Sequence, residues 1–274
     1  MKNVAVLAAL MTVFAFAAPP AFAAVKVFLL AGQSNMLGVG TASEMPAPYN
    51  VPQTNVKYWK TDGTGRGEGW VDLRPRIVRD FFGPEVTFGY TLAHSIFPND
   101  RIYLVKYAIG GTTLTTDWKP DGTGYCYTAF KAAVKAAMQN LTSANLSPSI
   151  AGMIWMQGEA EAHTGVGAPQ YAANLTRFIT AVRSDFAAPD MPFVIGRIST
   201  YYGTKANNQL VRTAEETVPG QMRHVSWINT DDLGQWPLGT DYPGHYNAQG
   251  QIQLGIRFAN AIGCPANKGS EKSR

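Results

Sequence analysis

Five short apolar segments, each rich in β-branched and aromatic residues, recur along the chain. They are Val25–Leu30, Arg101–Tyr107, Met153–Met156, Phe193–Ile198 and His224–Asn229. Such runs are typical of strands that are buried on both faces. Helical spacing is found between or after them, at Glu85–Phe97, Tyr125–Leu141, Tyr171–Phe186, Leu210–Val218 and Gln249–Ile262. The alternation predicts an α/β domain in which helices cover both faces of a five-stranded parallel sheet, with right-handed crossovers and the strand order 2-1-3-4-5.

The composition favours one globular domain. Of the 274 residues, 46% are hydrophobic and 15% are charged, proportions that a disordered chain does not have. The net charge is +4, and the basic residues are scattered rather than interleaved with aromatic ones. We therefore expect no nucleic-acid partner. No cluster of cysteine and histidine has ligand spacing, so we expect no structural metal either.

The N-terminal segment has the pattern of an export signal. Lys2 precedes the apolar run Val4–Ala18, and Ala21-Phe22-Ala23 fits a small-x-small cleavage site. A membrane anchor is the alternative, but the run is short for a span and is broken by Pro19-Pro20. We expect a cleaved signal peptide at 1–23 and a secreted or periplasmic protein, of bacterial type, with no membrane span. A single domain at 24–265 and a disordered tail at 266–274 would follow.

The two cysteines, Cys126 and Cys264, leave two readings open. A disulfide is permitted in an exported protein, and two free thiols are equally consistent with the sequence. The chain is large enough to be a monomer, but the sequence does not fix the oligomeric state.

The first apolar segment ends abruptly at Gly32-Gln33-Ser34-Asn35. A serine just past the carboxyl end of a buried strand lies where open α/β sheets bind ligands. The backbone N–H groups at the start of the next helix are unpaired and attract negative charge. A hydroxyl nucleophile beside such donors supplies two parts of an acyl-transfer centre. The alternative is a turn in which the serine only caps a helix.

A candidate base lies near the other end of the chain. Asp241 precedes His245 by four residues, with a proline and a glycine between them. Histidine can take the proton of a serine hydroxyl near neutral pH, and a carboxylate commonly holds its ring in one tautomer. The loop allows Asp241 to fold back onto the ring, and Asn247 is placed to cap the following helix. Alone, His245 would be read as a surface histidine.

Four blocks together resemble the SGNH/GDSL hydrolases, in the branch that holds the sialate O-acetylesterase domain and carbohydrate esterase family 6. They are Gly32–Met36, Ala108–Leu114, Trp155–Glu159 and Asp241–Gly250. The resemblance runs from about Val25 to Ile262 and implies a three-layer α/β/α sandwich of the flavodoxin-like SGNH type. It also implies a serine esterase that needs no metal and no cofactor.

The resemblance and the places of the blocks after successive strands predict a role for each residue. Ser34 is the expected nucleophile, His245 the base and Asp241 the acid that orients it. The oxyanion would be held by the Ser34 and Gly111 N–H groups and by the Gln157 amide. The expected supporting residues are Gln33, Asn35, Gly110 and Glu159.

Two departures from the family pattern matter. The family's acid usually stands three residues before the histidine, and here the gap is four, so Asp231 or Asp232 is an alternative to Asp241. The family often has an aspartate two residues after the glutamate of the third block. Glu161 stands there in this chain, one methylene longer, and we expect substrate contacts at that point to differ.

The stretch Leu37–Gly83 has little periodicity and is long for a connection, which usually marks a ligand-facing segment. Tyr58–Trp70 and Trp118–Tyr125 place aromatic residues among glycines. These aromatics could stack on sugar rings or pack as lids, and the sequence leaves both readings open.

The sequence thus predicts a secreted esterase that removes O-acetyl groups from carbohydrates through an acyl-enzyme on Ser34. An acetylxylan esterase and a sialate O-acetylesterase are both consistent with it, and the partner is an acetylated glycan or oligosaccharide. The alternatives are a non-catalytic carbohydrate-binding protein on the same scaffold and a lipase or thioesterase of the wider superfamily. No Gly-x-Ser-x-Gly elbow is present, which argues against the α/β-hydrolase fold.

Overall fold

The computed structural model describes residues 23–61, 67–76 and 80–264. The predicted signal peptide and the predicted tail lie outside these residues, apart from Ala23. None of the described helices is both long enough and apolar enough to span a membrane.

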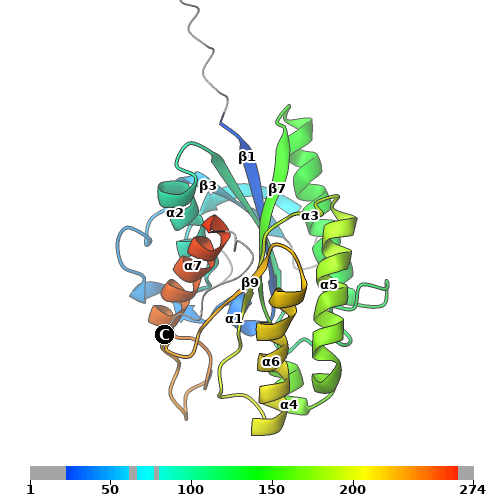
Figure 1. Ribbon diagram of the computed structural model, residues 1–274. Coiled ribbons are helices and arrows are strands. Elements are labelled where there is room, and N and C mark those ends of the chain that lie inside the picture. Colours follow the sequence, from blue (N-terminus) through cyan, green and yellow to red (C-terminus); the bar gives the residue numbers. More distant parts are fainter. Residues whose placement is uncertain (1–22, 62–66, 77–79, 265–274) are drawn as a thin grey trace, which may run out of the picture.

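Within the described residues, a seven-stranded sheet has the order β4-β3-β6-β1-β7-β8-β9 (Figure 1). Its strands are β1 (Val25–Gly32), β3 (Gln53–Thr61), β4 (Gly67–Leu73), β6 (Arg101–Ala108), β7 (Pro148–Met156), β8 (Phe193–Gly196) and β9 (Val225–Ile228). Neighbouring strands are parallel except for the antiparallel pair β3 and β4. A separate pair joins β2 (Gly40–Thr41) to β5 (Phe81–Phe82).

Helices cover both faces of the sheet and complete three layers (Figure 1). One face carries α2 (Glu85–Thr91) and α7 (Ala248–Gly263); the other carries α3 (Tyr125–Ser143), α5 (Tyr171–Asp185) and α6 (Lys205–Gln221). The short helices α1 (Ser34–Leu37) and α4 (Glu159–Thr164) begin just after β1 and β7. A π-helical turn, Leu92–Ile96, follows α2, and 3-10 turns lie at Ala42–Glu44 and Ala168–Gln170.

The predicted fold class and the order of the five predicted strands are confirmed. Those strands are β1, β6, β7, β8 and β9, and β6-β1-β7-β8-β9 is the order 2-1-3-4-5. The stretch 37–83 differs from the expectation of an irregular connection, since it supplies β3 and β4 and extends the sheet. The predicted helix 210–218 is longer in the structure because the Thr204 side chain caps it at Asn207 N–H.

Packing accounts for two of the aromatic residues whose role the sequence left open. Trp118 is fully buried, and its ring lies 5.1 Å from that of Trp155 in an edge-to-face contact. Trp59 on β3 is 4% exposed and packs edge-on against Trp70 of β4. Both cysteines are free thiols, Cys126 buried and Cys264 exposed.

Parallel register brings three separate blocks to one edge of the sheet. Gly32, the last residue of β1, pairs with Ala108 at the end of β6 and with Met156 at the end of β7. Gly32 has φ +148°, and a Cβ there would lie 2.0 Å from the Met156 carbonyl oxygen. Glycine therefore lets the chain turn so closely that Gln33 N–H donates to this same oxygen at 2.9 Å.

A buried ion pair joins α2 to β6. The Lys106 ammonium contacts the Glu85 carboxylate and donates to the Leu37 carbonyl at 2.8 Å, and both charged side chains are less than a tenth exposed. We expect Glu85→Ala to lower the free energy of unfolding by about 3–5 kcal/mol, because it leaves a buried ammonium without its counter-charge. Glu85→Leu combined with Lys106→Met should lower the free energy of unfolding much less, because it removes both buried charges. Urea unfolding followed by circular dichroism measures both, and equal losses would contradict the explanation.

Candidate active site

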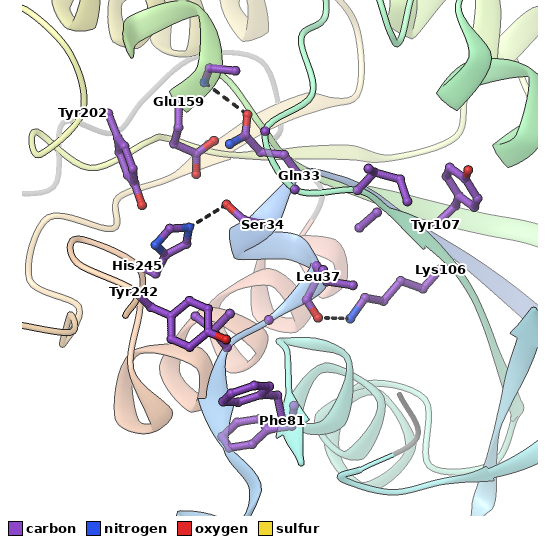
Figure 2. A pocket seen from close by; sticks show the side chains of 18 of the residues that line it. Gln33, Ser34, Leu37, Phe81, Lys106, Tyr107, Glu159, Tyr202, Tyr242 and His245 are labelled. Carbon is purple, nitrogen blue, oxygen red and sulfur yellow. Dashed lines mark hydrogen bonds between the residues drawn. The ribbon is translucent and has the colours of Figure 1, made fainter. Parts of the chain in front are cut away.

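Ser34 and His245 meet at the carboxyl edge of the sheet although 211 residues separate them in sequence. Ser34 is the first residue of α1, directly after the turn that ends β1. His245 lies in the loop between β9 and α7, and its Nε2 is 2.8 Å from Ser34 Oγ (Figure 2). Asn247 caps α7 as predicted, its side chain accepting from Gly250 N–H at 3.0 Å. A hydroxyl and an imidazole in this contact have the geometry of a nucleophile and its general base.

The structure does not bring a carboxylate to the other ring nitrogen. His245 Nδ1 is buried and has no hydrogen-bond partner among the described residues. Asp241 is exposed and forms no hydrogen bond or ion pair with any residue that the structure describes. The expected contact between Asp241 and the ring is therefore not present in this structure.

The two alternative acids are held elsewhere. Asp231 forms ion pairs with Arg197 and Arg212. Asp232 accepts two hydrogen bonds from Arg257, at 2.7 and 2.6 Å. The arginines therefore hold both carboxylates in contacts that do not include His245.

Two backbone N–H groups near Ser34 Oγ are available to a ligand. Neither Ser34 N–H nor Gly111 N–H donates a hydrogen bond within the described part of the chain. Gly111 has φ +72°, in the left-handed region that favours glycine. A Cβ on Gly110 would lie 3.7 Å from Ser34 Cβ, so this turn packs against the serine. The arrangement fits two donors of an oxyanion hole.

Gln157 lies behind the pocket rather than in its wall. It is fully buried, and its Nε2 donates to Thr112 O at 2.9 Å and to Glu161 Oε2 at 2.6 Å, with a longer contact of 3.3 Å to Gln33 Oε1. Its amide protons are thus directed at protein acceptors. The structure places Gln157 where it supports the site, and does not show the free donor that the sequence analysis expected.

Glu161 is also buried. Its carboxylate accepts from Gln157 and from the backbone N–H groups of Leu114 and Thr115. Burial raises its pKa, while these hydrogen bonds act in the opposite direction. Glu161 therefore ties the loop after β6 to α4. The expected difference in substrate contacts at this position is not found, because the side chain does not line the pocket.

The remaining supporting residues surround Ser34. Gln33 is 3% exposed, and its Oε1 is 3.3 Å from Ala160 N–H (Figure 2). Asn35 is fully buried and donates from Nδ2 to Glu159 Oε1 at 2.7 Å. Burial raises the pKa of Glu159 to about 7 against the opposing hydrogen bond from Asn35. These side chains hold the turn that carries the nucleophile.

A cavity of about 1220 Å³ opens in front of the pair and includes both Ser34 and His245 in its wall. Its wall is rich in aromatic residues, among them Phe81, Tyr107, Tyr201, Tyr202 and Tyr242. None of these five was predicted from the sequence as a site residue. Figure 2 shows Tyr202 on one side of the histidine and Tyr242 on the other. Tyr242 stands three residues before His245, where the family usually has its acid. That spacing was the signal in the sequence that could have identified it.

The described residues include no group of three or more histidine, cysteine, aspartate or glutamate side chains that could hold a metal ion. The chemistry that the geometry supports is acyl transfer to a serine hydroxyl, with backbone N–H groups facing the developing negative charge.

A family model for carbohydrate esterases, described as sialic acid-specific acetylesterase, matches residues 24–264. The chain belongs to this family. It is therefore a carbohydrate esterase of the acetylesterase type, as the four blocks predicted. No curated protein sequence matches the chain significantly.

Solved structures support the fold. A protein from Arabidopsis thaliana superimposes with a TM-score of 0.70 at 22% identity, covering 86% of this chain and 97% of that one. A carbohydrate acetylesterase from Xanthomonas citri gives 0.65 at 20% identity, covering 88% of this chain but 56% of that one. The protein NanS gives 0.64 at 15% identity, covering 87% and 96%. At these identities the likeness establishes the fold alone.

The acid limb of the pH profile tests the environment of the base. Burial lowers the pKa of His245 below its ordinary value of 6.5, and the backbone of Tyr242 and Pro243 partly offsets this. The base acts when neutral, so activity should fall only as the pH drops through this lowered pKa. We expect kcat/KM on an uncharged ester to have an acid limb with its midpoint below 6.5.

Burial raises the pKa of Glu159 to about 7. This carboxyl group therefore also ionises within the pH range of the profile, and its contribution needs a control. The profile should be repeated in the Glu159→Gln variant, where this carboxyl group no longer contributes. A midpoint at or above 6.5 in both proteins would contradict the assignment of His245 as a desolvated base.

Proposed function

We propose that this protein is exported and removes O-acetyl groups from carbohydrate hydroxyls through an acyl-enzyme on Ser34. The contact of 2.8 Å between Ser34 Oγ and His245 Nε2, at the wall of a large cavity, is the observation that carries the proposal. The family of the chain supports the choice of an acetylated carbohydrate. The export-signal pattern of residues 1–23 in the sequence supports secretion.

The reaction would proceed in two halves. His245 takes the proton of Ser34 as Oγ attacks the acetyl carbonyl carbon, and the Ser34 and Gly111 N–H groups face the oxyanion. The tetrahedral intermediate collapses, the bond to the sugar oxygen breaks, and the imidazolium protonates that oxygen. A water molecule then gives a proton to His245 and attacks the acyl carbon. The bond to Ser34 Oγ breaks, His245 returns its proton to this oxygen, and acetic acid leaves and ionises in solution.

The charges of the cavity favour an uncharged sugar over an acidic one. Lys106 is the only lysine or arginine among the described residues of the wall, and it is already paired with Glu85. Glu159 adds a carboxyl group on the same wall. A carboxylate on the substrate would enter this cavity without a free cation to meet it, which is unfavourable in a partly dry site.

Acetate release provides the direct test. We expect release from acetylated xylan by the wild-type protein, slower release from O-acetyl sialic acid, and loss of both in Ser34→Ala. Release that survives Ser34→Ala would contradict the acyl-enzyme. Glycan binding without release by the wild-type protein would instead indicate a binding protein, and preference for long acyl chains would indicate a lipase or thioesterase.

The role of the acid is tested by a separate pair of variants. Because Asp241 is exposed and has no contact with His245, Asp241→Asn should retain kcat within about threefold. His245→Ala should lower kcat by about three orders of magnitude or more, as the loss of a general base does in serine hydrolases. A large loss in Asp241→Asn, with circular dichroism unchanged, would show that this carboxylate reaches the ring during catalysis.

Tyr242 and Phe81 form an aromatic wall beside the base, with ring centroids 5.4 Å apart. A sugar that leaves from Ser34 toward His245 would pass this wall. We expect Tyr242→Ala to raise KM for an acetylated xylo-oligosaccharide about tenfold, the equivalent of one aromatic contact, and KM for glycerol triacetate much less. Tyr242→Phe, which keeps the ring, is the matched control. Equal changes on both substrates would contradict a sugar-binding wall.

A further inference from the structure

Asn35 connects the nucleophile turn to the loop that carries the base. Its Nδ2 donates to Glu159 Oε1 at 2.7 Å, and its Oδ1 accepts from the N–H of Tyr246 at 3.1 Å. Its backbone carbonyl accepts from Gln251 Nε2 at 3.2 Å. Asn35, Glu159 and Tyr246 are each 1% exposed or less. One buried side chain therefore joins the residue after Ser34 to the residue after His245.

Glu159 determines which way the Asn35 amide faces. Tyr246 N–H is a donor and needs the amide oxygen, so the amide nitrogen must face the other direction. There it needs an acceptor, which Glu159 Oε1 provides. Without this acceptor the amide would lose the contact that sets its direction, and a flipped amide would set two donors against each other at Tyr246.

No described side chain hydrogen-bonds to Nδ1 of the base, and the ring contacts that it makes are edge-on packing against Tyr202 and Tyr242, with centroids 5.8 and 6.2 Å away. Asp241, the expected partner of Nδ1, is exposed.

Edge-on packing is not directional in the way a hydrogen bond is, so the ring position depends also on how the backbone on either side is held. On the N-terminal side, His245 N–H donates to Tyr242 O at 3.1 Å. On the C-terminal side, His245 O accepts from Trp236 N–H at 2.7 Å, and the next N–H, that of Tyr246, donates to the Asn35 side chain.

We propose that Asn35 and Glu159 are positioning residues that hold His245 against Ser34 through the Tyr246 N–H. This inference rests on the proposed function, since it concerns the same pair. In this arrangement an amide and a carboxyl group fix the base through its backbone, a task that a carboxylate on Nδ1 performs in a serine triad. A small displacement of a positioned base is costly, because about 1 Å of misplacement can lower the rate a hundredfold.

The bridge requires an acceptor at position 159 rather than a negative charge. Glu159 Oε2 is buried and has no hydrogen-bond partner, so one oxygen makes the contact to Asn35 and the other is unpaired. A glutamine keeps the accepting oxygen and places its NH2 group at the unpaired position. A methionine has nearly the same length and lacks the acceptor. These two substitutions therefore separate the hydrogen bond from the packing.

The test compares Glu159→Gln, Glu159→Met and Asn35→Ala with the wild-type protein. We expect Glu159→Met to lower kcat on glycerol triacetate by about 30- to 100-fold with KM changed less than about threefold, since the base is displaced while methionine keeps the length of this wall side chain and the substrate is uncharged. Glu159→Gln should restore kcat to within about fivefold. In Asn35→Ala and in the double variant Asn35→Ala/Glu159→Met, kcat should fall by about as much as in Glu159→Met alone, and no further. The effects of residues that act as a unit are not additive.

A second anchor of the same loop gives the matched control. Trp236 Nε1 donates to Val39 O at 3.0 Å, and its side chain has no hydrogen bond with Asn35 or Glu159. A phenylalanine removes this bond and keeps the backbone bond from residue 236 to His245 O. Trp236→Phe should lower the thermal midpoint and leave kcat per folded molecule within about threefold. Circular dichroism gives the folded fraction of each variant, and labelling of Ser34 by an uncharged phosphonate reports the reactivity of the pair without a turnover.

The outcomes distinguish this inference from the function on which it rests. Wild-type kcat in Glu159→Met, or equal losses in Glu159→Met and Glu159→Gln, would overturn the bridge. Losses in Trp236→Phe as large as those in Glu159→Met would show that general loosening of the loop is responsible, and would also overturn it. Activity that persists in Ser34→Ala would overturn the proposed function itself.

Discussion

The site depends on the register of three parallel strands. β1, β6 and β7 end at the same level, with Gly32 beside both Ala108 and Met156. The residues that follow each strand therefore meet at one edge: Ser34 after β1, Gly110 and Gly111 after β6, and Gln157 and Glu159 after β7. A shift of one residue in either pairing would exchange the side chains of a buried strand between two helix-covered faces, where their shapes would no longer fit the packing. Burial of the sheet on both faces thus also fixes the geometry of the nucleophile and its donors.

Behind the pocket, polar side chains replace the apolar packing found elsewhere in the core. Gln157, Glu159 and Glu161 are each 1% exposed or less, and each has at least one hydrogen-bond partner. Desolvation raises the pKa of both glutamates. Such a network is unfavourable unless its groups are paired. The pairing here joins the loops after three strands to one another, so the positions of the nucleophile and the oxyanion donors are coupled.

The candidate pair of Ser34 and His245 differs from a complete triad in how its histidine is held. His245 touches Ser34 through Nε2 and has a buried Nδ1 without a side-chain partner. The position where the family usually has its acid is occupied by Tyr242, which faces the cavity instead. The loop thus combines two tasks: its backbone positions the base, and one of its aromatic rings contributes to the wall. This arrangement links the orientation of the histidine to contacts that lie outside the candidate pair.

Much of the fold and part of the site could be read from the sequence. Apolar runs identified the five parallel strands and their order, because strands buried on both faces leave a strong local pattern. The family blocks pointed to Ser34, His245 and the turn at Gly110 and Gly111, which the structure brings to one edge of the sheet. The strands β3 and β4 were missed, since they lie at one side of the sheet and their pattern is interrupted by polar and glycine residues. The short separation of Asp241 and His245 along the chain also suggested this aspartate as the partner of the histidine.

Only the tertiary structure decided where each polar group finds its partner. It shows Asp241 exposed, Asp231 and Asp232 held by arginines, and Gln157 directed at protein acceptors. It also shows that Asn35 reaches across 211 residues of sequence to the backbone of Tyr246. The physical reason is the range of the interactions. Hydrophobic periodicity is local and is written along the chain, whereas a hydrogen bond is specified by the distance and direction of two groups that folding alone brings together.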